Sequence, residues 1–460
     1  MQLSVFIGVL LILIYAGFII GRRRAFAVSG RNTRNLHSLP SYYGYYIVVW
    51  CGIPAFLLVL FWMALENTVV TALITSSLPP DLQSLPPARL NLLLNDIRNL
   101  AAGDATSSAA DPAMQAAAAH YRSLKHTSFA AMCVIGIVLV MAGILLGRRY
   151  ISPSLRARNL VERTAMVFLV AASTIAVLTT IGIVLSLLFE AIRFFRQVSP
   201  IEFLFGLEWS PQIAMRADQV ASSGSFGAVP IFAGTALISA IALIVAVPIG
   251  LLSAIYMAEY AAPRFRAVVK PVLEILAGIP TVVYGFFAAL VVAPLLRDGG
   301  TSIGLTISSE SALAAGLVMG IMIIPFVSSL SDDVITAVPQ SMREGSYGLG
   351  ATKSETIRRV ILPAALPGIV GSVLLAASRA IGETMIVVMA AGLTARLTAN
   401  PFEAVTTVTV QIVTLLVGDQ EFDSPKTLAA FALGLVLFMI TLGLNVIALR
   451  VVQKYREKYD

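Results

Sequence analysis

The chain has 460 residues, of which 58% are hydrophobic and only 12% are charged, and its mean hydropathy is +0.86. Soluble domains carry about 25% charged residues, so this composition excludes a soluble globular protein. A net charge of +7 would fit a nucleic-acid partner, but in a membrane protein the basic residues first report topology. Three scattered histidines and two cysteines give no metal-ligand spacing.

Apolar runs near 20 residues long, the length that crosses a bilayer core of roughly 30 Å, recur along the whole chain. The first run lacks a preceding positive charge and is followed by Arg22, Arg23 and Arg24, which favours an anchor with its N-terminus outside over a cleavable signal. Nine transmembrane helices are predicted, over residues 3–21, 43–65, 128–147, 165–190, 229–255, 268–296, 311–330, 364–392 and 427–449.

The distribution of basic residues supports that orientation. With the N-terminus outside, and with Lys270 and Arg450 assigned to the flanking inner ends, the predicted inner segments hold 21 Lys and Arg and the outer segments hold 10. Arg379 is the one basic residue left, within the eighth span. This excess predicts a cytoplasmic C-terminus. It also attributes the net charge to topology and to anionic membrane lipid, so no nucleic-acid partner is expected.

The long outer segment 66–127 contains an amphipathic helical pattern. Two interpretations remain open: a small helical cap packed on the outer surface, or a docking surface for a soluble partner. The apolar positions of the pattern are Leu90, Leu92, Leu93, Leu94, Ile97 and Leu100.

The fourth inner loop, residues 331–363, reads SDDVITAVPQSMREGSYGLGATKSETIRRVILP. SMREGSYGL and SETIRRVIL predict two short helices, with Gly348 and Gly350 allowing a turn between them. Ser354 with Glu355 is typical of a helix start, and Pro363 predicts the end of regular structure before the eighth span. Such a pair of surface helices would fit a groove on another protein.

The same loop contains a near match to a phosphate-binding motif. GLGATKS, residues 348–354, ends like a Walker A loop, but Thr352 stands where glycine must precede Lys353. We therefore expect no ATP binding, no enzymatic activity and no cofactor in this chain.

The loop resembles the EAA coupling loop of ABC importer permeases, whose pattern is E-A-A-x3-G-x9-I-x-L-P. Glu344, Gly350, Leu362 and Pro363 match at the same spacing. The sequence departs from the pattern at Gly345 and Ser346, where two alanines are usual, and at Val360, where isoleucine is usual. The resemblance implies that the loop inserts into a cleft on a cytoplasmic ATPase subunit.

Residues 160–455 further resemble the PstC-type permease of the phosphate-specific ABC importer. The resemblance implies an all-α polytopic membrane protein with a six-helix type I ABC importer permease core at 161–455. Residues 1–160 would then be an N-terminal extension with three more transmembrane helices. The stretches that carry it are VSPIEFLFGLEWSPQ (198–212), FGAVPIFAGTALISAIALIVAVPIGLLSAIYMAEYA (226–261), AGIPTVVYGFFAAL (277–290) and SRAIGETM (378–385).

The resemblance also implies partners. One permease supplies one coupling loop while an ATPase dimer has two clefts, so a second permease of the PstA type is expected beside a PstB-type ATPase dimer. A PstS-type phosphate-binding protein would deliver inorganic phosphate outside a bacterial inner membrane.

Arg379 and Glu383 stand out inside the eighth predicted span, because each charge costs on the order of 2.5–3.5 kcal/mol in a membrane. On a continuous helix they would share one face, one turn apart. Three interpretations remain open: a structural salt bridge between packed helices, a proton relay, or a phosphate pathway. In the last, the planar guanidinium of Arg379 meets phosphate oxygens and Glu383 holds it or tempers its grip.

Thr281 and Tyr284 are weaker candidates for the same pathway. Both can donate hydrogen bonds, and Gly278 with Pro280 can bend their helix. The alternative is local packing in a kinked span.

The function predicted from these features is the permease subunit of a phosphate ABC importer. An ABC permease for molybdate, sulfate or phosphonate is the alternative within the class. A stand-alone secondary transporter is the alternative from another class, although it would leave the coupling loop unexplained.

Overall fold

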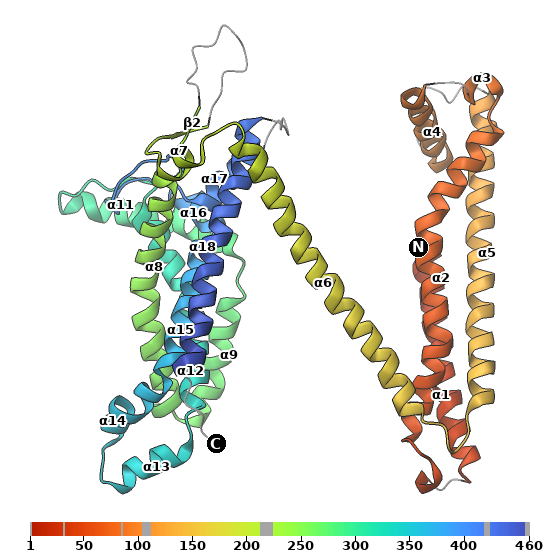
Figure 1. Cartoon of the computed structure of the whole chain (residues 1–460), viewed down its shortest axis with the longest axis horizontal. Helices are drawn as coiled ribbons and strands as arrows, with labels where there is room; N and C mark the ends of the chain where they lie inside the picture. The colour runs from red at the N-terminus through yellow and green to blue at the C-terminus, as the bar shows by residue number, and fades with distance from the viewer. Residues whose placement is uncertain are drawn as a thin grey trace. The chain divides into compact units, whose positions relative to one another are not determined.

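The computed structural model describes residues 2–30, 33–83, 86–103, 112–211, 224–417 and 424–455. Within them the chain is almost wholly helical, and the only sheet is a pair of two-residue antiparallel strands, β1 (Trp209–Ser210) and β2 (Ser225–Phe226). The chain divides into two compact units, residues 1–178 (unit 1) and 179–460 (unit 2). Helix α6 (Ala157–Phe195) passes from one to the other (Figure 1).

Nine helices in the described part of the chain are long and apolar enough to cross a membrane, so the predicted number of spans is confirmed. Several helices are longer than predicted. The second covers Pro40–Ser77 and the third Pro112–Tyr150, against predictions of 43–65 and 128–147. Hydropathy marks only the apolar part of a helix, whereas its own backbone hydrogen bonds carry it on into polar flanks. The chain is a multi-pass membrane protein.

Unit 1 is built on three long helices that pack together: α1 (Gln2–Val28), α2 (Pro40–Ser77) and α5 (Pro112–Tyr150). Their close approach depends on small residues. A Cβ at Gly143 of α5 would lie 2.7 Å from the Cα of Cys51 on α2. Small residues allow membrane helices to come this near. Cys51 is buried in this contact, and both it and Cys133 are free thiols.

The insert between the second and third spans forms a small helical cap within unit 1. It contains α3 (Pro80–Gln83) and α4 (Pro87–Ala102), while residues 104–111 lie outside the described part of the chain. Most of the predicted apolar face of α4 is covered, since Leu94 and Ile97 are buried together with Ile74 of α2 and Met114 of α5. Leu92, which the pattern also placed on that face, is 66% exposed. This packing favours the cap over a docking surface. A short 3-10 turn, η1 (Thr33–Asn35), joins α1 to α2.

Unit 2 is centred on α12 (Ala312–Thr336), which packs against α8 (Val229–Ile255). Glycines make this contact close: a Cβ at Gly320 of α12 would lie 2.9 Å from the Cβ of Val245 on α8. A Cβ at Gly250 of α8 would lie equally near the Cβ of Val327 on α12. The two helices therefore form one tightly packed pair.

The remaining elements of unit 2 surround this pair. Figure 1 shows α13 and α14 at one end of the unit, which we name the loop end, and α7, β2 and α17 at the opposite, far end. In chain order they are α7 (Pro200–Phe205), η2 (Tyr256–Tyr260), α9 (Pro263–Ala277), α10 (Thr281–Phe287), η3 (Ala288–Val292), α11 (Ala293–Ser302), α13 (Gln340–Gly348), α14 (Lys353–Thr356), η4 (Ile357–Ile361), α15 (Leu362–Ile381), α16 (Met385–Ala390), α17 (Val408–Leu416) and α18 (Pro425–Tyr455). Segments η2, η3 and η4 are π-helical.

Two predicted spans are not continuous helices. The prediction of one helix over 268–296 is wrong, because α9 ends at Ala277 and α10 begins only at Thr281. Pro280 lacks the N–H that would continue the helix and disfavours helical geometry in the residue before it. The prediction of one helix over 364–392 is also wrong, because α15 ends at Ile381 and α16 begins at Met385.

Candidate functional site

The predicted coupling loop is a helical hairpin at the loop end of unit 2. Helix α13 ends at Gly348, and Gly350 then adopts a left-handed conformation with φ +85°, which residues with a Cβ rarely adopt. The amide of Ala351 donates to the carbonyl of Ser346 at 3.2 Å and closes the turn. The predicted turn between two short helices is therefore confirmed at Gly350.

The second helix of the hairpin begins at Lys353, one residue before the predicted Ser354–Glu355. Thr352 is its N-cap: its hydroxyl accepts from the amide of Glu355, and its own amide donates to the Glu355 carboxylate at 3.0 Å. This reciprocal capping box satisfies two amides that the first turn leaves without a helical partner.

The prediction that Pro363 ends regular structure is wrong. Residues 353–381 form one continuous helical run through α14, η4 and α15. In η4 the amide of Leu362 bonds the carbonyl of Ile357, five residues back. The helix tolerates Pro363 because its register already changes just before that residue.

The residues predicted to couple to an ATPase occupy different positions on the hairpin. Glu344 and Gly345 are exposed on α13. Ser346 faces the other helix, because its Oγ lies 2.8 Å from Oγ1 of Thr356. Leu362 is half-buried and Pro363 is exposed in the first turn of α15. Glu344 makes no ion pair within the described residues, so its carboxylate can meet a partner.

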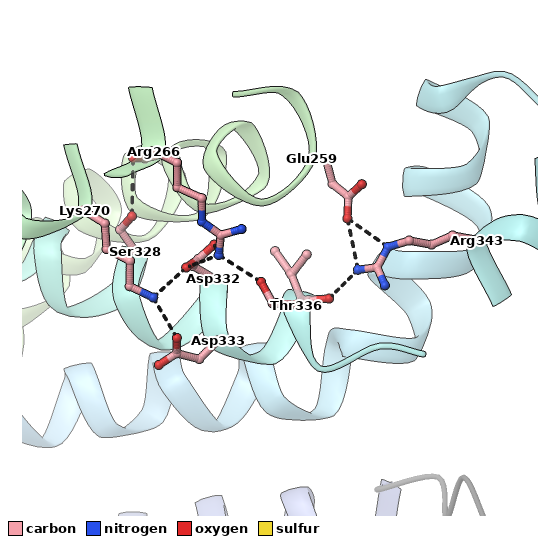
Figure 2. Close-up of polar contacts among 10 residues, drawn as sticks. Glu259, Arg266, Lys270, Ser328, Asp332, Asp333, Thr336 and Arg343 are labelled. Carbon is pink, nitrogen blue, oxygen red and sulfur yellow. Dashed lines mark hydrogen bonds and ion pairs between the residues drawn. The ribbon is translucent and has the colours of Figure 1, made fainter. Parts of the chain in front are cut away.

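Arg343, directly before Glu344, anchors α13 to the rest of unit 2. Its Nη2 lies 3.1 Å from Oε1 of Glu259 on η2 and donates to the carbonyl of Ile335 at 2.8 Å. Its Nη1 also donates to the carbonyl of Val338. Only 11% of the Arg343 side chain and 8% of the Glu259 side chain are exposed, so this is a buried ion pair (Figure 2). The motif comparison missed it, because Glu259 lies 84 positions away.

A second ionic cluster joins α9 to α12 at the same end. Asp332 of α12 is 1% exposed and accepts from Nη2 of Arg266 and from Nζ of Lys270, each at 2.9 Å (Figure 2). Asp333 accepts from Lys270 at 3.0 Å and is 63% exposed. A buried carboxylate persists only when it is paired in this way.

The hydrogen bonds to Asp332 and Asp333 raise the pKa of the Lys270 ammonium above its ordinary value of 10.5. Because this pKa is raised, the stabilisation that depends on the Lys270 ammonium is present below its ordinary pKa and is lost as the pH rises through the raised value.

Arg379 and Glu383 do not form the predicted pair. Glu383 lies in the break after α15, so it does not share a helical face with Arg379. No ion pair joins the two side chains in the described residues. The Arg379 guanidinium instead lies 5.6 Å from the centre of the Phe326 ring on α12, and the side chain is exposed. The interpretation of Arg379 and Glu383 as a structural salt bridge is therefore not supported.

Glu383 holds the break in place through its own turn and a neighbouring helix. Its Oε1 accepts from the amide of Met385 at 3.1 Å, and its carbonyl accepts from Oγ1 of Thr409 on α17 at 2.9 Å. Thr409 belongs to a set of buried hydroxyl and amide side chains, which the sequence analysis did not single out. The set also contains Thr235, Thr406, Thr407 and Gln411.

Thr281 and Tyr284 lie on α10, next to the other break. Thr281 is the first residue of that helix, and the hydroxyl of Tyr284 donates to the carbonyl of Leu276 at 3.1 Å, across the break. Helix α10 packs against α16, the helix that follows Glu383, since a Cβ at Gly285 would lie 2.7 Å from Sδ of Met389. The two breaks are thus neighbours in space. Among the described residues, no group of three His, Cys, Asp or Glu could hold a metal ion.

Comparison with known proteins adds two family models. Residues 246–457 match the family described as "Binding-protein-dependent transport system inner membrane component". Residues 7–179 match the family described as "Phosphate ATP-binding cassette transporter". The second match covers the N-terminal extension, which lies outside the region that resembles the PstC-type permease core.

Two relatives cover most of their own length. The probable ABC transporter permease protein YqgH of Bacillus subtilis is 35% identical over 62% of this chain and 86% of that protein. The phosphate transport system permease protein PstC of Mesorhizobium japonicum is 36% identical over 48% of this chain and 72% of that protein. A bacterial alginate ABC transporter structure is 16% identical with a TM-score of 0.44, over 66% of this chain and 99% of that one.

Proposed function

The chain belongs to the PstC-type permeases of ABC transporters, and on this premise we propose that it takes up inorganic phosphate as the transmembrane subunit of an importer. ATP hydrolysis on partner subunits drives the uptake. The observation that carries the proposal is the similarity to permeases named for phosphate transport, together with an exposed helical hairpin at the position of the coupling loop.

The chain itself is proposed not to hydrolyse ATP and to hold no cofactor. Thr352 occupies the position of the required Walker A glycine, and it caps α14. Residues 348–354 form the turn of a helical hairpin, and the element directly before them is the helix α13 rather than a strand. A Walker A loop follows a buried strand, so the local structure opposes nucleotide binding.

The proposed partners follow from one hairpin per chain. A PstB-type ATPase dimer offers two clefts, so a PstA-type permease supplies the second hairpin. A PstS-type protein brings phosphate to the opposite side, and lipid surrounds the spans. The proposed location is the bacterial inner membrane, with the N-terminus outside and the C-terminus cytoplasmic, supported by the excess of Lys and Arg on the inner side.

We assign the phosphate path to the neighbourhood of the two helix breaks. Apart from Lys270, near the inner end of the sixth predicted span, Arg379 is the only basic residue within a predicted span. Its side chain is exposed and no described carboxylate neutralises it, which suits recognition of an anion. Glu383 contributes through the turn that it forms, and Thr281 and Tyr284 line the neighbouring break. The domain proposal remains a permease core at 161–455 and an extension at 1–160.

Uptake by the reconstituted complex tests this function. The chain, its second permease and its ATPase are placed in liposomes, and radiolabelled phosphate uptake is measured with ATP inside and the binding protein outside. We expect uptake that needs both ATP and the binding protein and that excess sulfate or molybdate leaves unchanged. Competition by molybdate or sulfate would favour the alternative oxyanion permease. Uptake without ATP would favour a secondary transporter.

A further inference from the structure

Both arms of the coupling hairpin touch the same short element, the π-helical segment η2 at the loop end of α8. We propose that η2 and α8 carry the movement of the hairpin to the phosphate path, and that Glu259 and Arg343 are the positioning residues of this link. The inference rests on the proposed function, because it describes how the proposed phosphate importer couples ATP hydrolysis to the phosphate path.

The first contact is the buried pair of Arg343 and Glu259. Exposed ion pairs contribute little and rearrange easily, whereas a desolvated pair cannot lose one partner without leaving a buried charge. With 11% and 8% of these side chains exposed, the pair belongs to the second kind. Arg343 also donates to the carbonyl of Ile335, in the last turn of α12, and to that of Val338, just after α12, so its guanidinium is fixed on several sides.

The second contact comes from the other arm of the hairpin. The Lys353 ammonium, on the first residue of α14, lies 4.9 Å from the centre of the Tyr260 ring, next to Glu259 on η2. The two helices of the hairpin therefore hold neighbouring residues of one element. A push on either helix is applied to η2.

Helix α8 connects η2 to the far end of unit 2. With η2 it forms a single helical run of 32 residues, Val229–Tyr260. Such a run spans about 48 Å at 1.5 Å per residue. Near its far end, Oγ1 of Thr235 accepts from the amide of Val408 at 3.0 Å, at the start of α17. The next residue, Thr409, donates to the carbonyl of Glu383.

The chain of contacts thus runs from the exposed hairpin to the helix break beside Arg379. The close glycine contacts between α8 and α12 make these two helices move together, because neither can slide without a clash. Movement of α12 in turn displaces Phe326, over which the Arg379 guanidinium lies. One rigid pair of helices therefore links the ATPase side to the proposed anion site.

The test separates ATP hydrolysis from uptake in the reconstituted complex. Glu259→Gln and Arg343→Gln are each expected to lower phosphate uptake at least tenfold and to abolish the stimulation of ATPase activity by loaded binding protein. Basal ATPase activity and co-purification of the subunits are expected to persist. Because the two residues act as a unit, the double variant should lose no more than either single one.

Asp333→Asn is the matched control, because it removes a carboxylate at the same end that touches neither arm of the hairpin. Its uptake should stay within twofold of the wild type. Uptake within twofold for Glu259→Gln, independent losses in the double variant, or failure of both single variants to assemble would each overturn the link. A wild-type complex with stimulated ATPase but no phosphate uptake would refute the proposed substrate alone, since the loss of stimulation in Glu259→Gln still tests the link.

Discussion

The two units of this protein differ in how regular their membrane-spanning helices are. In unit 1, α1, α2 and α5 run unbroken for 27, 38 and 39 residues and pack through glycines and apolar side chains. In unit 2, two predicted spans are interrupted, three segments turn π-helical, and a carboxylate with 1% exposure sits among cations. Continuous helices suffice to span a membrane, and the proposed phosphate path lies at the two interruptions of unit 2.

A helix break leaves backbone groups without hydrogen-bond partners, and this explains which side chains surround it. Every backbone group that a break frees must find a partner, because lipid offers none. At the first break, the hydroxyl of Tyr284 donates to the carbonyl of Leu276. At the second, Thr409 donates to the carbonyl of Glu383. Hydroxyl side chains thus stabilise the two helix breaks of unit 2, and the three continuous helices of unit 1 need no such partners.

Arg379→Ala, at the second helix break of unit 2, is expected to have the largest effect on phosphate uptake. Losing two charge-assisted hydrogen bonds to phosphate, at about 1.5–3 kcal/mol each, should reduce uptake by at least about a hundredfold. Arg379→Lys should restore only part of it, because an ammonium lacks the planar fork. Initial rates of phosphate uptake in liposomes measure both variants.

Arg396→Ala is the control for Arg379, since that side chain is 67% exposed and lies in a long 3.7 Å pair with Glu403. We expect normal uptake from it. Normal uptake by Arg379→Ala in an assembled complex would remove Arg379 from the phosphate path.

Asp332→Asn tests whether the ionic cluster of unit 2 is a stability element. The substitution leaves Arg266 and Lys270 facing a neutral amide, which should cost roughly 3 kcal/mol, at the low end for a broken buried pair because both cations are partly exposed. Thermal unfolding of the purified chain in detergent should show a lower midpoint. Asp333→Asn, with its exposed carboxylate, should change the midpoint little. Equal midpoints for both variants would contradict the assignment.

Gly143→Ala probes the packing of unit 1. A Cβ there would lie 2.7 Å from the Cα of Cys51 and from the carbonyl oxygen of Trp50, so α2 and α5 must separate. Overpacking of this kind costs about 1–3 kcal/mol. Gly8→Ala on α1 is the control, because its Cβ meets nothing within 4 Å. We expect a lower unfolding midpoint only for Gly143→Ala, with coupled transport unchanged in the folded fraction. If Gly143→Ala lost coupled transport without a lower unfolding midpoint, unit 1 would have a role in the transport mechanism.

The sequence predicted the number of spans and the hairpin because both depend on local signals. Apolar runs mark helices wherever they pack, and Gly350 marks a left-handed turn. The breaks were harder to predict. Near Gly382 neither side of the break carries a proline, and the break depends on tertiary partners such as Thr409. The Arg343–Glu259 pair was also invisible, because residues 84 positions apart show no periodicity.

The smallest predicted effect concerns two glycines, two positions apart in the hairpin. Gly350 has φ +85° and open space around it, so Gly350→Ala is disfavoured by backbone conformation alone, at about 1 kcal/mol. Gly348 lies at the end of α13 without positive φ and has equally open space. An alanine there should be neutral or favour the helix. We expect a roughly fivefold loss of binding-protein-stimulated ATPase activity for Gly350→Ala and none for Gly348→Ala. If both variants lost stimulation equally, the hairpin surface rather than its turn geometry would be what the ATPase recognises, and the conformational role of Gly350 would be wrong.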